Sequence, residues 1–224
     1  MKNKLETVQN VGLPTHELVY RQLRELILFG EIAPGQAVTI QGITDRLAAG
    51  MTPVREAIRR LISEGALQFQ GNRRVIVPIL TSENLQELVF ARQAIEPQLI
   101  ILATRNATLD DFDALVSIDS GLDQAIQIGD LGAYLRHNYT FHQMLYGIAN
   151  APILAAIADG LWLRFGPSLR VVCGRVGTQS LVDQHKETLT AMRAGDAERA
   201  ARAIREDVMQ GMEQIRQVMP VSHR

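Results

Sequence analysis

The stretch from Pro34 to Pro78 constrains the fold of this chain more than any other part of the sequence. It holds two short segments of helical period separated by Ala49-Gly50, followed by two apolar runs of strand length around Gly71-Asn72. A helix, a tight turn, a second helix and a hairpin in this order are typical of a winged helix-turn-helix. The sequence therefore predicts a small module whose second helix can enter a groove of duplex DNA.

The second helix of this motif is expected to span residues 52–64. Thr52 can cap its N-terminus, and Pro53 suits the first helical position, where a missing N–H costs nothing. Gly65 supplies a C-terminal stop. Apolar residues recur at three- and four-residue intervals and form one stripe, namely Val54, Ala57, Ile58, Leu61 and Ile62. The helix is thus predicted to bury one face and to present arginines on the others.

The neighbouring segments complete the module. Residues 15–29 show apolar positions at helical spacing before Gly30 and predict a first packing helix. Residues 43–48 are expected to form the first helix of the motif. The runs 67–69 and 75–77 predict the two strands of the wing.

Composition limits the class of protein. The 224 residues are 46% hydrophobic and 21% charged, which is typical of a globular protein with a sizeable core. No window approaches the roughly 18 apolar residues of a membrane span, and the N-terminus has no secretory signal, so we expect a soluble cytoplasmic protein. The single Cys173 excludes an internal disulfide and a cysteine-based zinc ribbon, and its expected role is a small packed side chain.

The net charge of −1 hides an asymmetry along the chain. Residues 1–80 carry ten Lys and Arg against seven Asp and Glu, whereas residues 81–224 carry thirteen against seventeen. The N-terminal part is therefore the better candidate for contact with a polyanion, although so small an excess supports the helix-turn-helix interpretation without establishing it.

After Pro78 the pattern becomes helical throughout. Apolar stripes of helical period are interrupted at Asn106, Gly129, Asn150 to Pro152, Gly166-Pro167, Gly174 to Gly177, and Gly195-Asp196, which predicts about six helices. Oxygen-bearing side chains suited to N-terminal capping occur at Ser82, Thr108, Asp130 and Asp196. The fold class predicted for the whole chain is mainly α, an N-terminal winged helix-turn-helix followed by an antiparallel all-helical bundle.

The segments LRELILFGEIAPGQ, TPVREAIRRLISEGAL and NRRVIVP resemble the DNA-binding domain of the GntR family of bacterial transcription regulators. The helical part is similar to the FCD type of effector domain found in the FadR branch. The matching segments are ARQAIEPQLIILA with Arg92 and Glu96, NYTFHQMLYGIAN with Asn138 and His142, DQHKETLTAMRAGD with His185, and GDAERAARAIREDV. Together the two resemblances cover nearly the entire chain.

Two departures from the family pattern stand out. Members usually carry a Ser-Arg pair just before the Thr-Pro, where this sequence has Gly50-Met51, so a side-chain cap and a guanidinium placed near DNA bases are missing. Many members also present an Asp or Asn and then three His to a divalent metal. Here Asp207 occupies the position of the last His, so the metal site is altered.

Four residues are candidate metal ligands. Asn138 and His142 are four residues apart, so on a helix their side chains leave the same face about 5–6 Å apart at Cβ. His185 and Asp207 lie in amphipathic patterns of later helices, and an antiparallel bundle can direct both inward. This mixed nitrogen and oxygen set suits zinc, nickel, manganese or iron. The spacing alone also fits histidines of the core or surface, whereas the resemblance implies a divalent metal site.

The resemblance further implies that a small organic acid binds at coordination positions left open by the protein. Arg92 could hold its carboxylate in a bidentate way, or could form an ion pair within the chain with Glu96, four residues later. Tyr139 and Phe141 flank the metal motif and either line the effector pocket or belong to the core.

On the DNA side, Arg55 in the first turn of the second helix is the candidate for contact with a guanine. Gln41 and Thr52 are expected to meet phosphate, and Arg59 and Arg60 either do so or form a solvated face. The wing would bring its turn residues to the backbone or minor groove, namely Gly71, Asn72, Arg73 and Arg74.

These features predict three parts: a flexible arm over 1–14, a winged helix-turn-helix over 15–79, and a helical effector-binding and dimerisation domain over 80–220. The leading hypothesis is a homodimeric, ligand-responsive regulator on a palindromic operator in double-stranded DNA, most often in this family a repressor released by a metabolite. The alternative is a metal-dependent enzyme that uses the bundle site. Against it, the sequence holds no Ser/His/Asp arrangement and no phosphate-binding glycine loop.

Overall fold

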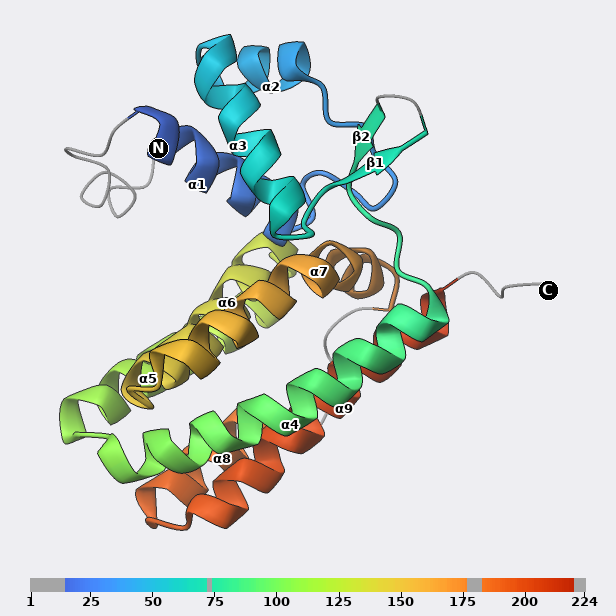
Figure 1. Ribbon diagram of the computed structural model, residues 1–224. Helices are drawn as coiled ribbons and strands as arrows, with labels where there is room; N and C mark the ends of the chain where they lie inside the picture. The colour runs from blue at the N-terminus through green and yellow to red at the C-terminus, as the bar shows by residue number, and fades with distance from the viewer. Residues whose placement is uncertain (1–14, 72–73, 177–182, 220–224) are drawn as a thin grey trace. The chain divides into compact units, whose positions relative to one another are not determined.

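The computed structural model describes residues 15–71, 74–176 and 183–219. The chain divides into two compact units, residues 1–79 and residues 80–224, and each is described by itself (Figure 1). The expected flexible arm over 1–14 and the wing residues Asn72 and Arg73 lie outside the described residues.

The first unit is a three-helix module with a two-stranded wing. Its elements are α1 (Thr15–Leu28), α2 (Ile40–Leu47), α3 (Met51–Ser63), β1 (Gln68–Gln70) and β2 (Arg74–Ile76). Helix α1 packs on α3, and the core between them contains Leu23, Ile27, Val54 and Leu61, which are all inaccessible to solvent. The amphipathic stripes predicted from the sequence are the faces that are buried.

The turn between α2 and α3 is made by small residues. Ala48 adopts a left-handed conformation with φ of 50° as the C-cap of α2, and Gly50 is the N-cap of α3 without any side-chain hydrogen bond. The expectation that Thr52 caps this helix is wrong, because α3 begins at Met51. The first backbone bond of the helix runs from Val54 N–H to Gly50 O, so Pro53 sits where its missing N–H costs nothing.

The wing is an antiparallel hairpin. Gln68 pairs with Ile76, Phe69 with Val75, and Gln70 with Arg74, one residue later in β1 and one earlier in β2 than the sequence predicts. The shift has a cause at each end. Leu67 N–H closes the end of α3 by donating to Leu61 O, and Val77 exchanges backbone hydrogen bonds with the Gly35–Gln36 segment instead of with β1. Gly71 in the turn has φ of 58°, a region that favours glycine.

The second unit contains six helices in its described part, in agreement with the sequence. They are α4 (Ser82–Asn106), α5 (Leu109–Ile128), α6 (Leu131–Ile148), α7 (Pro152–Val176), α8 (Gln184–Arg193) and α9 (Ala197–Val218). Helix α4 lies along α9, α5 along α6, and α8 against α9 (Figure 1). None of the helices in the described ranges is both long enough and apolar enough to cross a membrane.

The N-terminal caps of these helices are mostly those expected. Thr108, Asp130 and Asp196 each accept a backbone N–H from the first turn of the following helix. The cap of α4 is Thr81 and not Ser82, because Thr81 and Asn84 form a reciprocal capping box. Asp183, which caps α8, was not predicted.

The break expected at Gly166-Pro167 is wrong, because α7 runs through both residues. Both are buried, and α7 packs against α4, α6 and α9. Packing of a long helix on three neighbours offsets the local cost of an internal proline, which is about 3 kcal/mol in an isolated helix. Pro97 is accommodated in the same way inside α4.

Candidate functional site

The exposed face of α3 carries two arginines that form no ion pair within the described part of the chain. Arg55 and Arg59 are exposed and make no hydrogen bond or ion pair with any described residue. Thr52 is exposed on the same helix. Because an ammonium or guanidinium group that is not paired within the protein is available to a phosphate or a base edge, this face fits the expected DNA contact.

Arg60 differs from its two neighbours. It forms ion pairs of 3.0 Å with both Glu17 and Glu64, and its guanidinium lies 3.5 Å from the centre of the Tyr20 ring. The Tyr20 hydroxyl also lies within 3.0 Å of both carboxylate oxygens of Glu64, to which it donates. Arg60 was expected either to meet phosphate or to form a solvated face, whereas its observed contacts tie α3 to α1.

The remaining candidates for DNA contact lie on α2 and the wing. Gln41 is exposed and donates a hydrogen bond of 2.8 Å to Asp45. Gly71 and Arg74 are exposed at the wing, while Asn72 and Arg73 lie outside the described residues.

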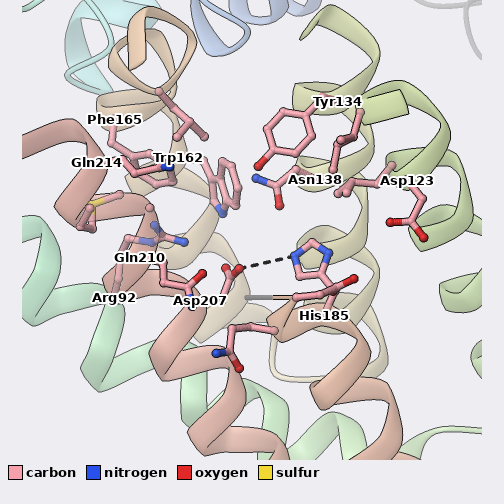
Figure 2. A pocket seen from close by; sticks show the side chains of 17 residues that line it. Arg92, Asp123, Tyr134, Asn138, Trp162, Phe165, His185, Asp207, Gln210 and Gln214 are labelled. Carbon is pink, nitrogen blue, oxygen red and sulfur yellow. Dashed lines mark ion pairs between the residues drawn. The ribbon is translucent and has the colours of Figure 1, made fainter. Parts of the chain in front are cut away.

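A cavity of about 240 Å³ lies inside the second unit and is lined by all of its helices (Figure 2). Tyr134 and Asn138 point into it from α6, and Arg92 from α4 lies on another side (Figure 2). Most of the other polar groups that line it come from α5, α8 and α9: Asp123, Asp183, Gln184, His185, Asp207, Gln210 and Gln214.

Three of the four predicted metal ligands lie close together, and two of them, His185 and Asp207, line this cavity. His142 of α6, His185 of α8 and Asp207 of α9 each offer a ligand atom, and these atoms all lie within 4.8 Å of one another. His142 Nε2 is 3.2 Å from Asp207 Oδ2, and His185 Nε2 is 3.8 Å from Asp207 Oδ1 (the second contact is dashed in Figure 2). Asn138, the fourth candidate, lines the same cavity one helical turn before His142.

A second layer of carboxylates stands behind the two histidines. His142 Nδ1 lies 3.5 Å from Glu96 Oε2, and His185 Nδ1 lies 3.5 Å from Asp119 Oδ1. A carboxylate at one ring nitrogen and a metal at the other is the arrangement that fixes the tautomer of a ligating histidine. Sequence reasoning missed Asp119, and it assigned Glu96 only a role with Arg92.

The residues present fit a divalent metal. His142 is fully buried, and neither of its ring nitrogens has a hydrogen bond of good geometry in the described structure. A buried polar nitrogen without a well-aligned hydrogen bond is costly, and a ligated cation is one group that would satisfy it. Although burial by itself raises the pKa of Asp207, the neighbouring His142 and His185 lower it to about 2, so this ligand is ionised.

Arg92 forms an ion pair with Glu96, which is the second of the two roles considered for it. Its side chain is 3% exposed, and it forms a two-point ion pair with Glu96 through Nε and Nη2. Its guanidinium lies 4.2 Å from the centre of the Phe165 ring. Burial opposes ionisation of Glu96, but the charge of Arg92 outweighs it and the pKa of Glu96 falls to about 2. Arg92 nevertheless lines the cavity, and its Nη1 takes no part in the ion pair with Glu96.

Tyr139 does not line the cavity, so the structure gives no support to its expected contact with the effector. Its hydroxyl donates to Asp159 Oδ1 at 2.6 Å, and its ring packs edge-on against Trp162. Tyr134 lines the cavity instead. The signal was present in the sequence, because Tyr134, Asn138 and His142 follow one another at four-residue intervals and so share a helix face, whereas Tyr139 is rotated about 100° from Asn138.

A winged helix-turn-helix joined to a helical unit defines a class of protein, the DNA-binding regulators with a separate helical domain. Residues 15–77 match the gntR family of bacterial regulatory proteins, and residues 87–209 match the FCD domain. The chain belongs to the GntR family and carries an FCD domain, which confirms the resemblance found in the sequence.

Curated relatives and solved structures agree with this assignment. The HTH-type transcriptional regulator McbR of Escherichia coli K12 is 28% identical over 197 residues, covering 87% of this chain and 89% of McbR. The HTH-type transcriptional repressor RspR of the same organism is 26% identical, covering 96% and 94%. The solved structure of E. coli McbR/YncC superposes with a TM-score of 0.85 at 27% identity, covering 92% of this chain and 98% of that chain.

Proposed function

We propose that this protein is a cytoplasmic, ligand-responsive repressor that binds a palindromic operator as a homodimer and leaves it when a small carboxylate binds in the helical unit. The observation that carries the proposal is the cluster of His142, His185 and Asp207, of which His185 and Asp207 line a cavity, in the same chain as a winged helix-turn-helix. Such a cavity of about 240 Å³ lies below the roughly 300–1,000 Å³ of drug-sized sites and suits a small metabolite.

At the operator, Arg55 donates two guanidinium N–H groups, one to O6 and one to N7 of a guanine. Arg59, Gln41 and Thr52 bind phosphates and fix the register of α3 in the major groove. The wing, with Gly71, Asn72 and Arg73 at its turn, approaches the backbone or the minor groove. Two copies related by a twofold axis place two such helices in successive half-sites of a palindrome.

In the helical unit, His142, His185 and Asp207 hold a divalent metal, with Asn138 as a fourth ligand. The set of two imidazoles, a carboxylate and an amide oxygen suits zinc, nickel, manganese or iron. Such an ion supplies positive charge and open coordination positions at the cavity. Glu96 and Asp119 orient the two histidines from behind.

The charges around the cavity support a metal requirement for acid binding. The lining holds the carboxylates of Asp123, Asp183 and Asp207, and the single lining cation, Arg92, is neutralised by Glu96. Lys186 offsets only part of this charge by pairing with Asp123 and Asp183. Without further positive charge the described cavity repels an anion. A metal held by His142, His185 and Asp207 would supply that charge, and Arg92 contributes at most its remaining Nη1.

The alternative of a metal-dependent enzyme finds no support in the relatives, which are transcriptional regulators and repressors. A binding role also requires fewer positioned groups than catalysis, because no general base needs to be placed against a substrate.

The experiment combines three measurements on the full chain. In vitro selection from random duplexes yields the operator, elemental analysis identifies the metal, and fluorescence anisotropy follows operator release while small carboxylates are titrated. His142→Ala is expected to lose metal and the response to acid while keeping operator binding. His137→Ala, on the same helix but outside the cluster, serves as the matched control. Retention of metal by His142→Ala contradicts the proposed site, and release by no carboxylate with metal bound contradicts the proposed effector class.

A further inference from the structure

Met51 is an exposed apolar side chain at an unusual place. It is the first residue of α3 and is 53% exposed, whereas Val54, Ile58 and Leu61 of this helix are buried. A single exposed apolar residue needs no explanation on an ordinary surface. At the N-terminal turn of a helix that enters DNA, however, side chains reach the base edges.

The neighbours of Met51 define the surface to which it belongs. Arg55 lies four residues later and Arg59 four residues after that, so the three side chains follow one another along one side of α3. Both arginines are exposed and unpaired among the described residues. Met51 therefore lies at the N-terminal end of a basic face of α3 formed with Arg55 and Arg59. A polyanion such as DNA is complementary to this face and buries Met51 when the helix enters the groove.

The chemistry of the thioether determines which group in the groove Met51 can contact. Methionine has no hydrogen-bond donor for O6 or N7, and its sulfur accepts only weakly from the amino groups at N4 and N6. The one apolar group on the floor of the major groove is the C5-methyl of thymine. Desolvating Met51 against any other base edge leaves that base polar group without a partner, which is unfavourable.

We propose that Met51 reads a thymine methyl group in each half-site and thereby sets the base preference next to the guanine bound by Arg55. This inference rests on the proposed DNA-binding function. It also predicts an effect on DNA specificity for the replacement of the family's usual Ser-Arg pair by Gly50-Met51. An arginine at this position would favour guanine, whereas Met51 favours thymine, so the operator of this protein differs at that base pair from those of relatives with the usual Ser-Arg.

The test removes the C5-methyl group of single thymines from the DNA and the thioether of Met51 from the protein. A duplex selected in vitro by the wild-type full chain is resynthesised with each thymine replaced in turn by deoxyuracil, which lacks only the C5-methyl. Dissociation constants are measured by anisotropy for the wild type, for Met51→Ala, and for Met209→Ala, an exposed methionine of the helical unit used as the matched control.

At one thymine in each half-site, uracil is expected to weaken binding by wild type and by Met209→Ala about fourfold, the factor for loss of one buried methyl contact. The same replacement should leave binding by Met51→Ala unchanged, and selection with Met51→Arg should return guanine at that position. The proposal is overturned if every uracil replacement affects wild type and Met51→Ala equally. If the wild type selects no sequence, the DNA-binding function itself fails, and the Met51 contact fails with it.

Discussion

Replacement of Glu96 by glutamine should destabilise the helical unit strongly even without metal. Glu96 is fully buried and forms a two-point ion pair with Arg92, which is 3% exposed. Glu96→Gln keeps the shape of the side chain but leaves the arginine buried without a compensating charge. Breaking a buried pair in this way costs about 3–5 kcal/mol, because the remaining charge has lost water and gains nothing in return.

The matched control is a pair of the same residue types on the surface. Arg216 and Glu213 are an ion pair on α9 with side chains 70% and 40% exposed. An exposed pair contributes about 0–1 kcal/mol, so Glu213→Gln should be nearly neutral. The two substitutions remove the same charge and differ in burial.

Differential scanning calorimetry in the presence of EDTA measures both variants without a contribution from bound metal. For a protein of this size about 1 kcal/mol corresponds to 2–4 °C in Tm, so Glu96→Gln should lower the transition of the helical unit by roughly 6–20 °C. Equal small shifts for Glu96→Gln and Glu213→Gln would refute the reasoning, because they would mean that Arg92 finds other compensation or that water reaches the pair.

Three further outcomes are expected. Arg55→Ala should weaken operator binding by about 1–3 kcal/mol and relax specificity at one base pair, while Arg202→Ala on α9 leaves the dissociation constant unchanged in the same shift assay. Tyr20→Phe, which removes the hydroxyl held by Glu64, should lower the unfolding free energy by about 1–2 kcal/mol in urea titration without altering the salt dependence of DNA binding. Chelation of the metal should abolish operator release by carboxylates in anisotropy titrations, and persistent release in EDTA would place the effector elsewhere.

Much of the fold could be predicted because helical periodicity records which face of each element is buried. The stripe through Val54, Ala57 and Leu61 gave the packing of α3, and Asp130 and Asp196 gave the starts of α6 and α9. Local patterns failed where distant packing decides the outcome. Gly166-Pro167 interrupts an isolated helix, but contacts of α7 with three neighbours keep it continuous.

In the candidate site, too, local spacing could be predicted from the sequence, whereas contacts set by the packing of distant helices could not. The four-residue spacing of Asn138 and His142 places both on one helix face, and the resemblance supplied His185 and Asp207 on separate helices. The role of Asp119 could not be predicted, because its position behind His185 depends on how α5 packs against α8. The position of Tyr139 outside the cavity follows from the same helix geometry, since one residue of offset turns a side chain about 100° away from its neighbour.

The substitution of Asp207 for the family's third histidine changes the charge of the proposed metal site as well as its geometry. In members with Asn as the first ligand, three neutral imidazoles around a divalent ion leave a net charge of about +2, whereas Asn138, two imidazoles and a carboxylate leave about +1. Carboxylate oxygen favours harder ions such as manganese more than imidazole nitrogen does. Asp207 also faces both histidines through its two oxygens, at 3.2 and 3.8 Å, so its ionised state is stabilised before any metal arrives. We therefore expect a metal held at the proposed site to attract an anionic effector less strongly than one held by Asn and three histidines, which favours a singly charged acid over a multiply charged one.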